Sequence, residues 1–358
     1  MKGGDFMLRK KFYLKSGIFF IIFAIAFIYL SSASIAQIKS KEQFQLEIST
    51  LPTGFASYLI GVGLADLINK KSNFIKATHI EGRSPVVHMR TLITKPEKRK
   101  SYLFFNTTWD IWEAKKQLGP FEKVPFKYEE FRFIFLMGVA GNGLCTLDQN
   151  IKTLKDMVGK RVIFDSTPGG GREIVYKGIL NELGIPVDKL KYQYASGETA
   201  GAALRDGMAD VIYSGSALKR LPHFHVASPF TAELVATKNV YFISFEEKAI
   251  KSFKSKTGHP VDFQVLPPKI LGPLQTEPYT ILLKPLGFCA HQDMPEDVVQ
   301  EILNIVYENA HLLKEYTPMA EIINKESLAS LGIPEGDYHS AAQKFFKQKG
   351  IKIKGLGF

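Results

Sequence analysis

The sequence predicts an α/β protein built from two lobes, and three observations support this prediction. The chain has 358 residues, which exceeds the roughly 250 to 300 at which a single core usually divides into domains. Strand-like and helix-like segments alternate through most of the chain, as they do in parallel sheets covered by helices. This alternation begins at residue 44 and begins again after residue 150. Two such runs predict two sheets, one in each lobe.

Each lobe is expected to hold a mainly parallel sheet flanked by helices. The expected strands are 44–49, 74–80, 102–106, 161–164, 190–194 and 211–213. The expected helices are 58–70, 86–93, 172–183 and 198–206. We expect lobe 1 to comprise residues 37–142 plus 272–358, and lobe 2 to comprise residues 143–271.

The C-terminal third lacks this alternation. Residues 258–285 contain six prolines, a density that we expect to exclude a continuous helix or a central strand. We interpret this stretch as the return of the chain to lobe 1. Residues 295–314 and 318–331 carry apolar residues at helical spacing, which predicts a helical C-terminal segment.

The N-terminus has the layout of a secretory signal peptide. Five basic residues lie in or before residue 15, an apolar run covers 18–30, and Ser34-Ile35-Ala36 ends the segment with small side chains. We expect residues 1–36 to be removed by cleavage between Ala36 and Gln37, and the mature protein to be periplasmic. A retained membrane anchor is the alternative, although the run is shorter than the ~20 residues that span a bilayer.

Composition and motifs exclude several classes of protein. Removal of residues 1–36 lowers the formal charge from +11 to +7, but the lysines are scattered, so we expect no nucleic-acid partner. No G-x-S-x-G or H-E-x-x-H motif is present, so we expect no catalytic residue and no cofactor. His223 and His225 lack acidic or cysteine partners at ligand spacing, so no metal site is expected. Cys145 and Cys289 are expected to be buried free thiols, with a disulfide as the alternative.

Candidate binding residues lie where strands end and helices begin, because ligands of open α/β sheets bind beyond the carboxyl ends of the strands. In the first such loop, Thr53, Ser57 and Tyr58 offer hydroxyl groups beside the free N–H groups of a helix start. The alternative role for Thr53 or Ser57 is ordinary N-capping. In the second loop, Ser84 suits a helix cap and Arg83 could clamp a carboxylate or simply be a solvated arginine.

The third loop runs from Asp165 to Arg172 and contains three consecutive glycines. We expect the backbone N–H groups near Thr167, Gly170 and Gly171 to face a negative group, assisted by Arg172. A tight turn is the alternative. Ser214 follows a strand and is a further candidate, as is Thr107.

Trp109 and Trp112 are three residues apart, so they share a face if this segment is helical. Trp109 is a candidate for stacking on a flat or apolar part of the ligand. The alternative is that both indoles belong to the core.

Four segments, in this order, resemble the TAXI family of solute receptors, the binding proteins of TRAP-type transporters. They are TGFASYLIGVGLADLINK (53–70), EGRSPVVHMRTLI (81–93), TLKDMVGKRVIFDSTPGGGRE (153–173) and LRDGMADVIYSG (204–215). His88 stands where the family has Asn, and Arg172 replaces a small residue. Residues 104–121 are unusually aromatic for this position.

The resemblance implies a type II periplasmic binding protein fold of two lobes that close on a solute. Such a protein is expected to be a monomer, to bind a small polar, carboxylate-bearing solute such as an organic acid or amino acid, and to deliver it to TRAP-type membrane subunits. Two alternatives remain open: a binding module that reports to a membrane sensor, and a bilobal periplasmic enzyme that acts on a small acid through Glu173, Asp110 or Glu198.

Overall fold

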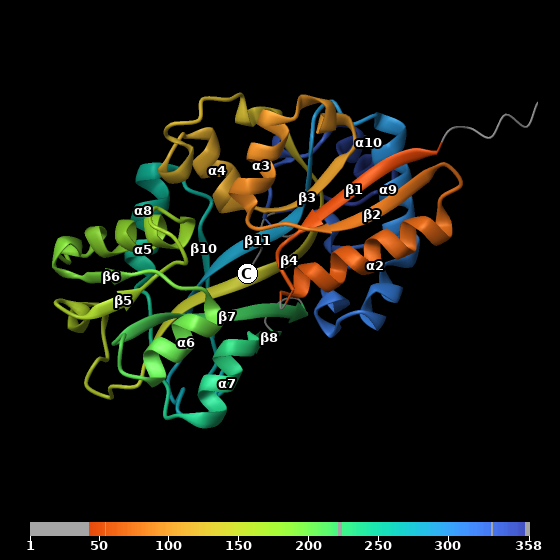
Figure 1. Cartoon of the computed structure of the whole chain (residues 1–358). Helices are drawn as coiled ribbons and strands as arrows, with labels where there is room; N and C mark the ends of the chain where they lie inside the picture. The colour runs from red at the N-terminus through yellow and green to blue at the C-terminus, as the bar shows by residue number, and fades with distance from the viewer. Residues whose placement is uncertain (1–42, 54, 221–223, 331, 355–358) are drawn as a thin grey trace, which may run out of the picture. The chain divides into compact units, whose positions relative to one another are not determined.

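The computed structural model describes residues 43–53, 55–220, 224–330 and 332–354 (Figure 1). The chain divides into two units, Met1–Phe44 and Gln45–Phe358. The first unit lies almost wholly outside the described residues, as do the expected signal peptide and its cleavage point. All that follows concerns the second unit.

One mixed sheet forms the centre of this unit, and its strands run in the order β2-β1-β3-β11-β4-β7-β5-β6. One end of the sheet, which we call the first end, consists of β2 (Ile75–Glu81), β1 (Phe44–Thr50) and β3 (Tyr102–Thr107). The second end consists of β7 (Val211–Arg220), β5 (Arg161–Ile163) and β6 (Lys191–Gln193). Two long strands lie between them, β4 (Phe131–Thr146) and β11 (Tyr279–His291). Three further strands pair at the sides: β8 (Phe224–Ala227), β9 (Tyr241–Ile243) and β10 (Asp262–Leu266).

Helices surround both ends of the sheet (Figure 1). Those before β4 are α2 (Ala56–Lys71), α3 (Pro85–Thr94) and α4 (Thr108–Lys115). Those between β4 and β11 are α5 (Gly171–Glu182), α6 (Gly197–Arg205), α7 (Pro229–Thr237) and α8 (Glu247–Thr257), and α9 (Glu296–Asn309) and α10 (Ser340–Gln348) follow β11. None of the helices in the described part of the chain is long and apolar enough to span a bilayer.

All ten segments expected in the two βαβ runs are present, and nine of them match within two residues at each boundary. The tenth is β7, which continues to Arg220. Local chemistry explains such agreement: Ser84 caps α3 by accepting a hydrogen bond from Val87 N at 3.3 Å, and Pro85 occupies the first turn. In α2, Ile60, Leu64 and Ile68 recur at four-residue spacing and are buried, as an amphipathic helix requires. The α/β class is therefore confirmed.

The prediction of two separate sheets is wrong, because β4 and β11 join the two ends into one sheet. β4 has 16 residues and β11 has 13, so each is long enough to pair at both ends. β4 pairs with β11 and with β7, antiparallel in both cases. The parallel pairs β1–β3, β5–β6 and β5–β7 belong to the expected βαβ runs, so the sheet as a whole is mixed.

The expectation that residues 258–285 exclude a central strand is also wrong. β11 includes Pro285 and lies between β3 and β4. On the side away from β4, residues 279–283 of β11 pair with β10 and residues 286–289 pair with β3. Pro285 lies at the change of partner, where neither β10 nor β3 pairs with it, and a proline is tolerated in a strand where its missing N–H group has no ladder partner.

The expected helical segment 318–331 contains two short 3-10 helices in its described part, η7 (Pro318–Ile322) and η8 (Ser327–Ala329), in place of an α-helix. Between them Asn324 Oδ1 accepts hydrogen bonds from Glu326 N and Ser327 N, at 3.0 and 3.1 Å. A side chain that satisfies backbone donors in this way competes with helix formation. By contrast, 295–314 is helical as expected, as α9 followed by the 3-10 helix η6 (Ala310–Glu315).

Cys145 and Cys289 are buried free thiols, which confirms the favoured prediction. Burial raises the pKa of Cys145 to about 12. Both cysteines therefore act as small apolar core residues.

Candidate functional site

Five charged side chains meet where the two ends of the sheet join, and we call them the charged cluster. They are Asp110 and Glu113 of α4, Asp165 after β5, Arg172 of α5 and Lys284 of β11. These side chains interact electrostatically, since each of the other four shifts the pKa of Lys284. Charged groups are costly to bury, and clusters of perturbed ionisable groups are typical of functional sites.

Lys284 lies at the point of β11 where the neighbouring strand changes from β10 to β3. Its Nζ lies 5.4 Å from the centre of the Trp109 ring. Within the described residues, no carboxylate oxygen comes within 4.0 Å of this Nζ. Burial and the nearby Arg172 lower the pKa of Lys284, although Asp110, Asp165 and Glu113 oppose this shift.

Thr107 and Asp110 are positioned by the start of α4. Thr107 is the N-cap, and its Oγ1 accepts a hydrogen bond from Asp110 N at 3.2 Å while donating to Asp110 Oδ2. Asn106 Oδ1 in turn accepts from Thr107 N at 2.7 Å. Burial raises the pKa of Asp110 despite the attraction of Lys284.

Trp109, Trp112 and Glu113 lie on one face of α4, directed at His259. Both indole rings contact the His259 ring, with centroids 5.5 and 4.7 Å apart, so the predicted shared face is confirmed. Glu113 Oε1 lies 3.8 Å from His259 Nε2, and neither atom has a hydrogen-bond partner. Val261 N donates to His259 Nδ1 at 3.0 Å, so the proton of the neutral ring is on Nε2, which faces Glu113.

The surroundings of this pair oppose a charge on either member. Burial, with repulsion from Asp110, raises the pKa of Glu113 well above its ordinary value. Burial, with the charges of Lys284 and Lys254, lowers the pKa of His259 to about 3.

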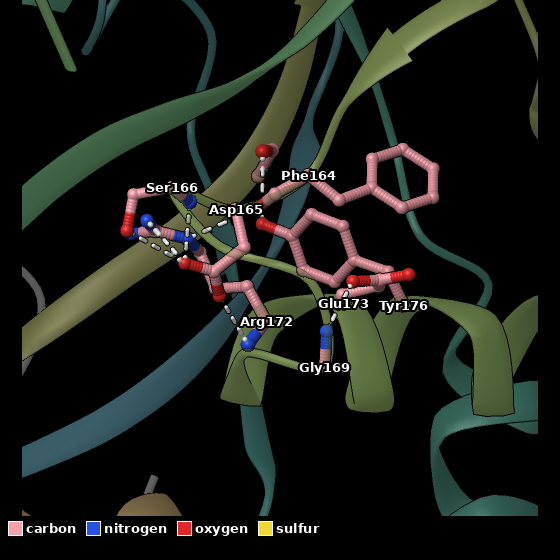
Figure 2. Close-up of polar contacts among 8 residues, drawn as sticks. Phe164, Asp165, Ser166, Gly169, Arg172, Glu173 and Tyr176 are labelled. Carbon is pink, nitrogen blue, oxygen red and sulfur yellow. Dashed lines mark hydrogen bonds and ion pairs between the residues drawn. The ribbon is translucent and has the colours of Figure 1, made fainter. Parts of the chain in front are cut away.

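Asp165 is held at the N-terminus of α5 (Figure 2). Its Oδ1 accepts from Ser166 N at 2.7 Å, and its Oδ2 accepts from Arg172 N at 2.9 Å. The Arg172 guanidinium also pairs with Oδ1 at 3.3 Å. Burial opposes ionisation of Asp165, but Arg172, Lys284 and these N–H groups outweigh it and lower its pKa.

Arg172 is fixed by two further contacts. Its Nε donates to Phe164 O at 3.1 Å, and its guanidinium lies 3.8 Å from the centre of the Tyr213 ring. Asp165 and the hydroxyl-bearing rings around it raise the pKa of Arg172 despite burial. Arg172 is therefore a permanent, well-positioned cation.

The glycine-rich turn before α5 packs closely against the segment that contains α4. A Cβ at Gly171 would lie 2.9 Å from Glu113 Oε1, and a Cβ at Gly119 would lie 2.5 Å from Gly169 O. Only glycine permits such an approach. The turn and α4 therefore meet across the charged cluster.

Several residues predicted from the sequence lie in or beside the charged cluster. Arg172 belongs to it, Gly170 and Gly171 line its α5 side, and Thr107 and Trp109 line its α4 side. Trp109 is fully buried within the core of the second end of the sheet. Ser214 adjoins Tyr213 and hydrogen-bonds to Tyr279 Oη at 2.9 Å.

The candidates at the start of α2 make contacts of their own, apart from the charged cluster. Thr53 N donates to Glu81 Oε1 at 3.1 Å. Ser57 Oγ is buried without a partner, and the Tyr58 ring meets the His79 ring edge-on at 4.8 Å. The N-cap of α2 is Phe55, so neither Thr53 nor Ser57 caps this helix.

The remaining candidates also have local roles. Arg83 is exposed, and Ser84 caps α3. Thr167 is exposed, and its carbonyl accepts a hydrogen bond from Gly170 N at 3.2 Å.

Sequence reasoning did not select Glu113, Asp165, His259 or Lys284 as binding residues. Lys284 had a detectable signal, because it is the only Asp, Glu, Lys or Arg in the apolar run Tyr279–His291. Glu113 and His259 had none, since their contact depends on how α4 packs on the other end of the sheet.

Two cavities lie away from the charged cluster. One, of about 210 Å³, is bounded by α2 and η6 and includes Asp66 and Tyr316. The other, of about 60 Å³, lies between α7 and residues 272–274. In the described part of the chain, no group of three or more His, Cys, Asp or Glu side chains is arranged to hold a metal ion. His223, which was considered with His225, lies outside the described residues.

The chain resembles several solved structures at low sequence identity. The periplasmic aliphatic sulphonate binding protein SsuA from Escherichia coli is 13% identical, over 86% of this chain and 80% of that chain, with a TM-score of 0.44. The periplasmic binding protein BugD is 11% identical, over 86% and 98%, with a TM-score of 0.49. MatC from Rhodopseudomonas palustris with bound malate is 11% identical, over 85% and 96%, with a TM-score of 0.47.

The sequence itself matches a known family over most of its length. The model of the NMT1-like family matches residues 48–350, a range that contains every strand from β2 to β11 and the whole charged cluster. The chain belongs to the NMT1-like family.

Proposed function

We propose that this chain is an extracytoplasmic solute-binding protein that captures a small polar, carboxylate-bearing solute at the charged cluster. The observation that carries this proposal is Lys284, a half-buried cation between the two ends of the sheet without a carboxylate partner among the described residues. A charge in such a place is stabilised by a ligand of opposite charge.

The solute carboxylate pairs with Lys284 Nζ in this proposal. Arg172 attracts the solute carboxylate electrostatically but does not bond to it. Its guanidinium stays paired with Asp165 and packed on the Tyr213 ring. Asn106 and Thr107 pair with β11 beside Lys284, and Asp110 interacts electrostatically with it. These three residues supply hydrogen-bonding groups for a polar part of the solute. Binding also removes water from around the charges, which strengthens each of these interactions.

Capture involves movement of two lobes, for which we keep the predicted boundaries 37–142 plus 272–358 and 143–271. The charged cluster draws on both, with Asp110 and Lys284 from lobe 1 and Asp165 and Arg172 from lobe 2. A solute that contacts both lobes favours the shut arrangement, which is a population shift.

We further propose export to the periplasm through a signal peptide cleaved between Ala36 and Gln37, and delivery of the solute to TRAP-type membrane subunits. The N-terminal pattern and the ordered TAXI-like segments support these two steps. N-terminal sequencing of the exported protein is expected to begin at Gln37, and a chain that begins at Met1 would contradict cleavage.

A second candidate function is chemistry on the bound acid. The raised pKa values of Asp110 and Glu113 favour it, because burial shifts a carboxyl group toward the pKa that suits a general acid. Recovery of the solute unchanged after prolonged incubation with the protein would leave binding as the function.

Native mass spectrometry of the purified mature protein, followed by calorimetric titration of the recovered guest, tests the proposal. We expect a reproducible guest at one per chain, and an affinity at least ~10-fold weaker in Lys284→Met, the scale of a lost charged hydrogen bond. Lys347→Met, on the exposed face of α10, is the matched control and is expected to bind as the wild type does. Equal affinity in Lys284→Met would place the solute elsewhere.

A further inference from the structure

The glycine-rich turn before α5 is already occupied by an anion, and that anion is part of the chain. Asp165 is only 8% exposed, and a Cβ at Gly170 would lie 2.5 Å from its Cγ. The carboxylate therefore lies directly against the N-cap of α5. Figure 2 shows Asp165 between the Ser166 N–H group and Arg172.

Four backbone donors of this turn have acceptors within the chain. Ser166 N and Arg172 N donate to Asp165. Gly169 N donates to Glu173 Oε2 at 2.8 Å, and Gly170 N donates to Thr167 O at 3.2 Å. These are the groups that a solute anion would otherwise use at a helix N-terminus.

The Asp165 carboxylate also neutralises the nearest cation. Its Oδ1 pairs with Arg172, whose guanidinium is fixed on Tyr213. A second anion brought to this turn would meet a like charge and would find few free donors. Lys284, in contrast, has no carboxylate within 4.0 Å among the described residues.

We propose that Asp165 is a specificity-determining residue, because its carboxylate fills the anion position at the start of α5 and denies it to any anionic group of the solute. The solute carboxylate is thereby directed to Lys284. This second step rests on the proposed function, whereas occupation of the turn by Asp165 does not.

Formate tests the proposal, because it is the carboxylate that Asp165→Ala removes. Thermal unfolding of the wild type and of Asp165→Ala is followed during titration with sodium formate, against sodium chloride at equal ionic strength. We expect a saturable rise in the Tm of Asp165→Ala, with formate affinity on the order of tenfold above that of the wild type. Asp188→Ala, which removes an exposed carboxylate, is the matched control and is expected to show no such rise.

Two further variants separate occupation of the turn from a general salt effect. Asp165→Asn keeps the shape of the side chain, so we expect it to leave no room for formate and to give no saturable response. The double variant Asp165→Ala with Arg172→Ala is expected to lose the response, since the guanidinium that holds the anion is gone. If Asp165→Ala does not fold alone, its refolding yield in formate relative to chloride becomes the measurement.

The proposal is overturned if formate acts on Asp165→Ala, or on its refolding, no more than chloride does. It is equally overturned if the wild type binds formate or inorganic phosphate with an affinity that Arg172→Ala abolishes. Neither result depends on the natural solute. A positive formate response together with unchanged solute affinity in Lys284→Met would retain Asp165 as the occupant of the turn and refute only the location of the solute.

Discussion

At the scale of single residues, the most unusual feature is the contact between Glu113 and His259. Both side chains are about 1% exposed, yet Glu113 Oε1 and His259 Nε2 stop 3.8 Å apart without a partner. Unpaired polar groups at such depth cost free energy. A small approach of α4 toward His259 would complete a hydrogen bond, which links this pair to the movement proposed above.

Gly171→Ala is expected to lower the free energy of unfolding by about 1–3 kcal/mol, because the added methyl group would lie 2.9 and 3.1 Å from the two Glu113 oxygens and overpacking costs this much. Urea unfolding followed by circular dichroism measures the change. Gly336→Ala is the matched control, since a Cβ there meets nothing within 4 Å. Equal stability of the two variants would show that α4 does not rest on the turn.

Glu113→Gln is expected to become more stable than the wild type as the pH rises. The folded pKa of Glu113 lies well above its ordinary value of 4.5, so its contribution to stability is full below pH 4.5 and is lost as the pH rises toward the folded pKa. Glutamine has no such loss. Urea unfolding from pH 4 to 8 measures the difference, with the exposed Glu122→Gln as control. A difference that does not grow with pH would contradict a raised pKa of Glu113 in the folded protein.

At the scale of secondary structure, β11 determines where the charged cluster lies. β11 pairs with β10 through residues 279–283 and with β3 through residues 286–289. Lys284 and Pro285 lie between these two ladders, so the change of partner places a charged side chain and a residue without an N–H group at the same point. The strand also fixes Tyr279, whose Oη lies 2.9 Å from both Ser214 Oγ and Leu144 O.

Tyr279→Phe is expected to destabilise the protein by about 1–3 kcal/mol, because it removes the buried hydrogen bonds of Tyr279 Oη with Ser214 Oγ and Leu144 O. Differential scanning calorimetry measures the loss. Tyr241→Phe, which alters a half-buried ring on β9, is expected to change stability by less than about 0.5 kcal/mol. A loss no larger in Tyr279→Phe than in Tyr241→Phe would show that this link between β11, β7 and β4 contributes little.

Elements formed by local pattern could be predicted from the sequence, whereas those formed by long-range pairing could not. The alternation of strand and helix from Phe44 to Tyr213 appears in the structure almost as expected. β11 was missed because Pro285 signals a break, and its tolerance depends on partner strands that only the fold supplies. Likewise the glycine turn was found, but its occupation by Asp165 follows from a side chain folding back on backbone donors, which spacing does not show.

At the scale of the whole unit from Gln45 to Phe358, two helix-covered sheet ends share β4 and β11. In the closure proposed above, β4 and β11 bend and the two ends approach each other around the solute. The charged cluster lies at this junction and takes its members from α4, α5, β11 and the loop after β5. The distances between the charged side chains therefore depend on how these elements are placed relative to one another.

Movement of the proposed lobes predicts that the radius of gyration falls when the solute is added. A solute bound to both lobes favours the shut arrangement. Small-angle X-ray scattering of the mature protein, with and without the recovered guest, measures the change. Lys284→Met at the same guest concentration is expected to keep the larger radius, and an unchanged radius in the wild type would argue against closure.

The most direct measurement is the crystal structure of the mature protein with its recovered guest. We predict that a carboxylate oxygen of the guest lies within about 4 Å of Lys284 Nζ, with Asp165 still bonded to Ser166 N and Arg172 N. Guest density in the cavity between α2 and η6, with no ligand at Lys284, would contradict the account.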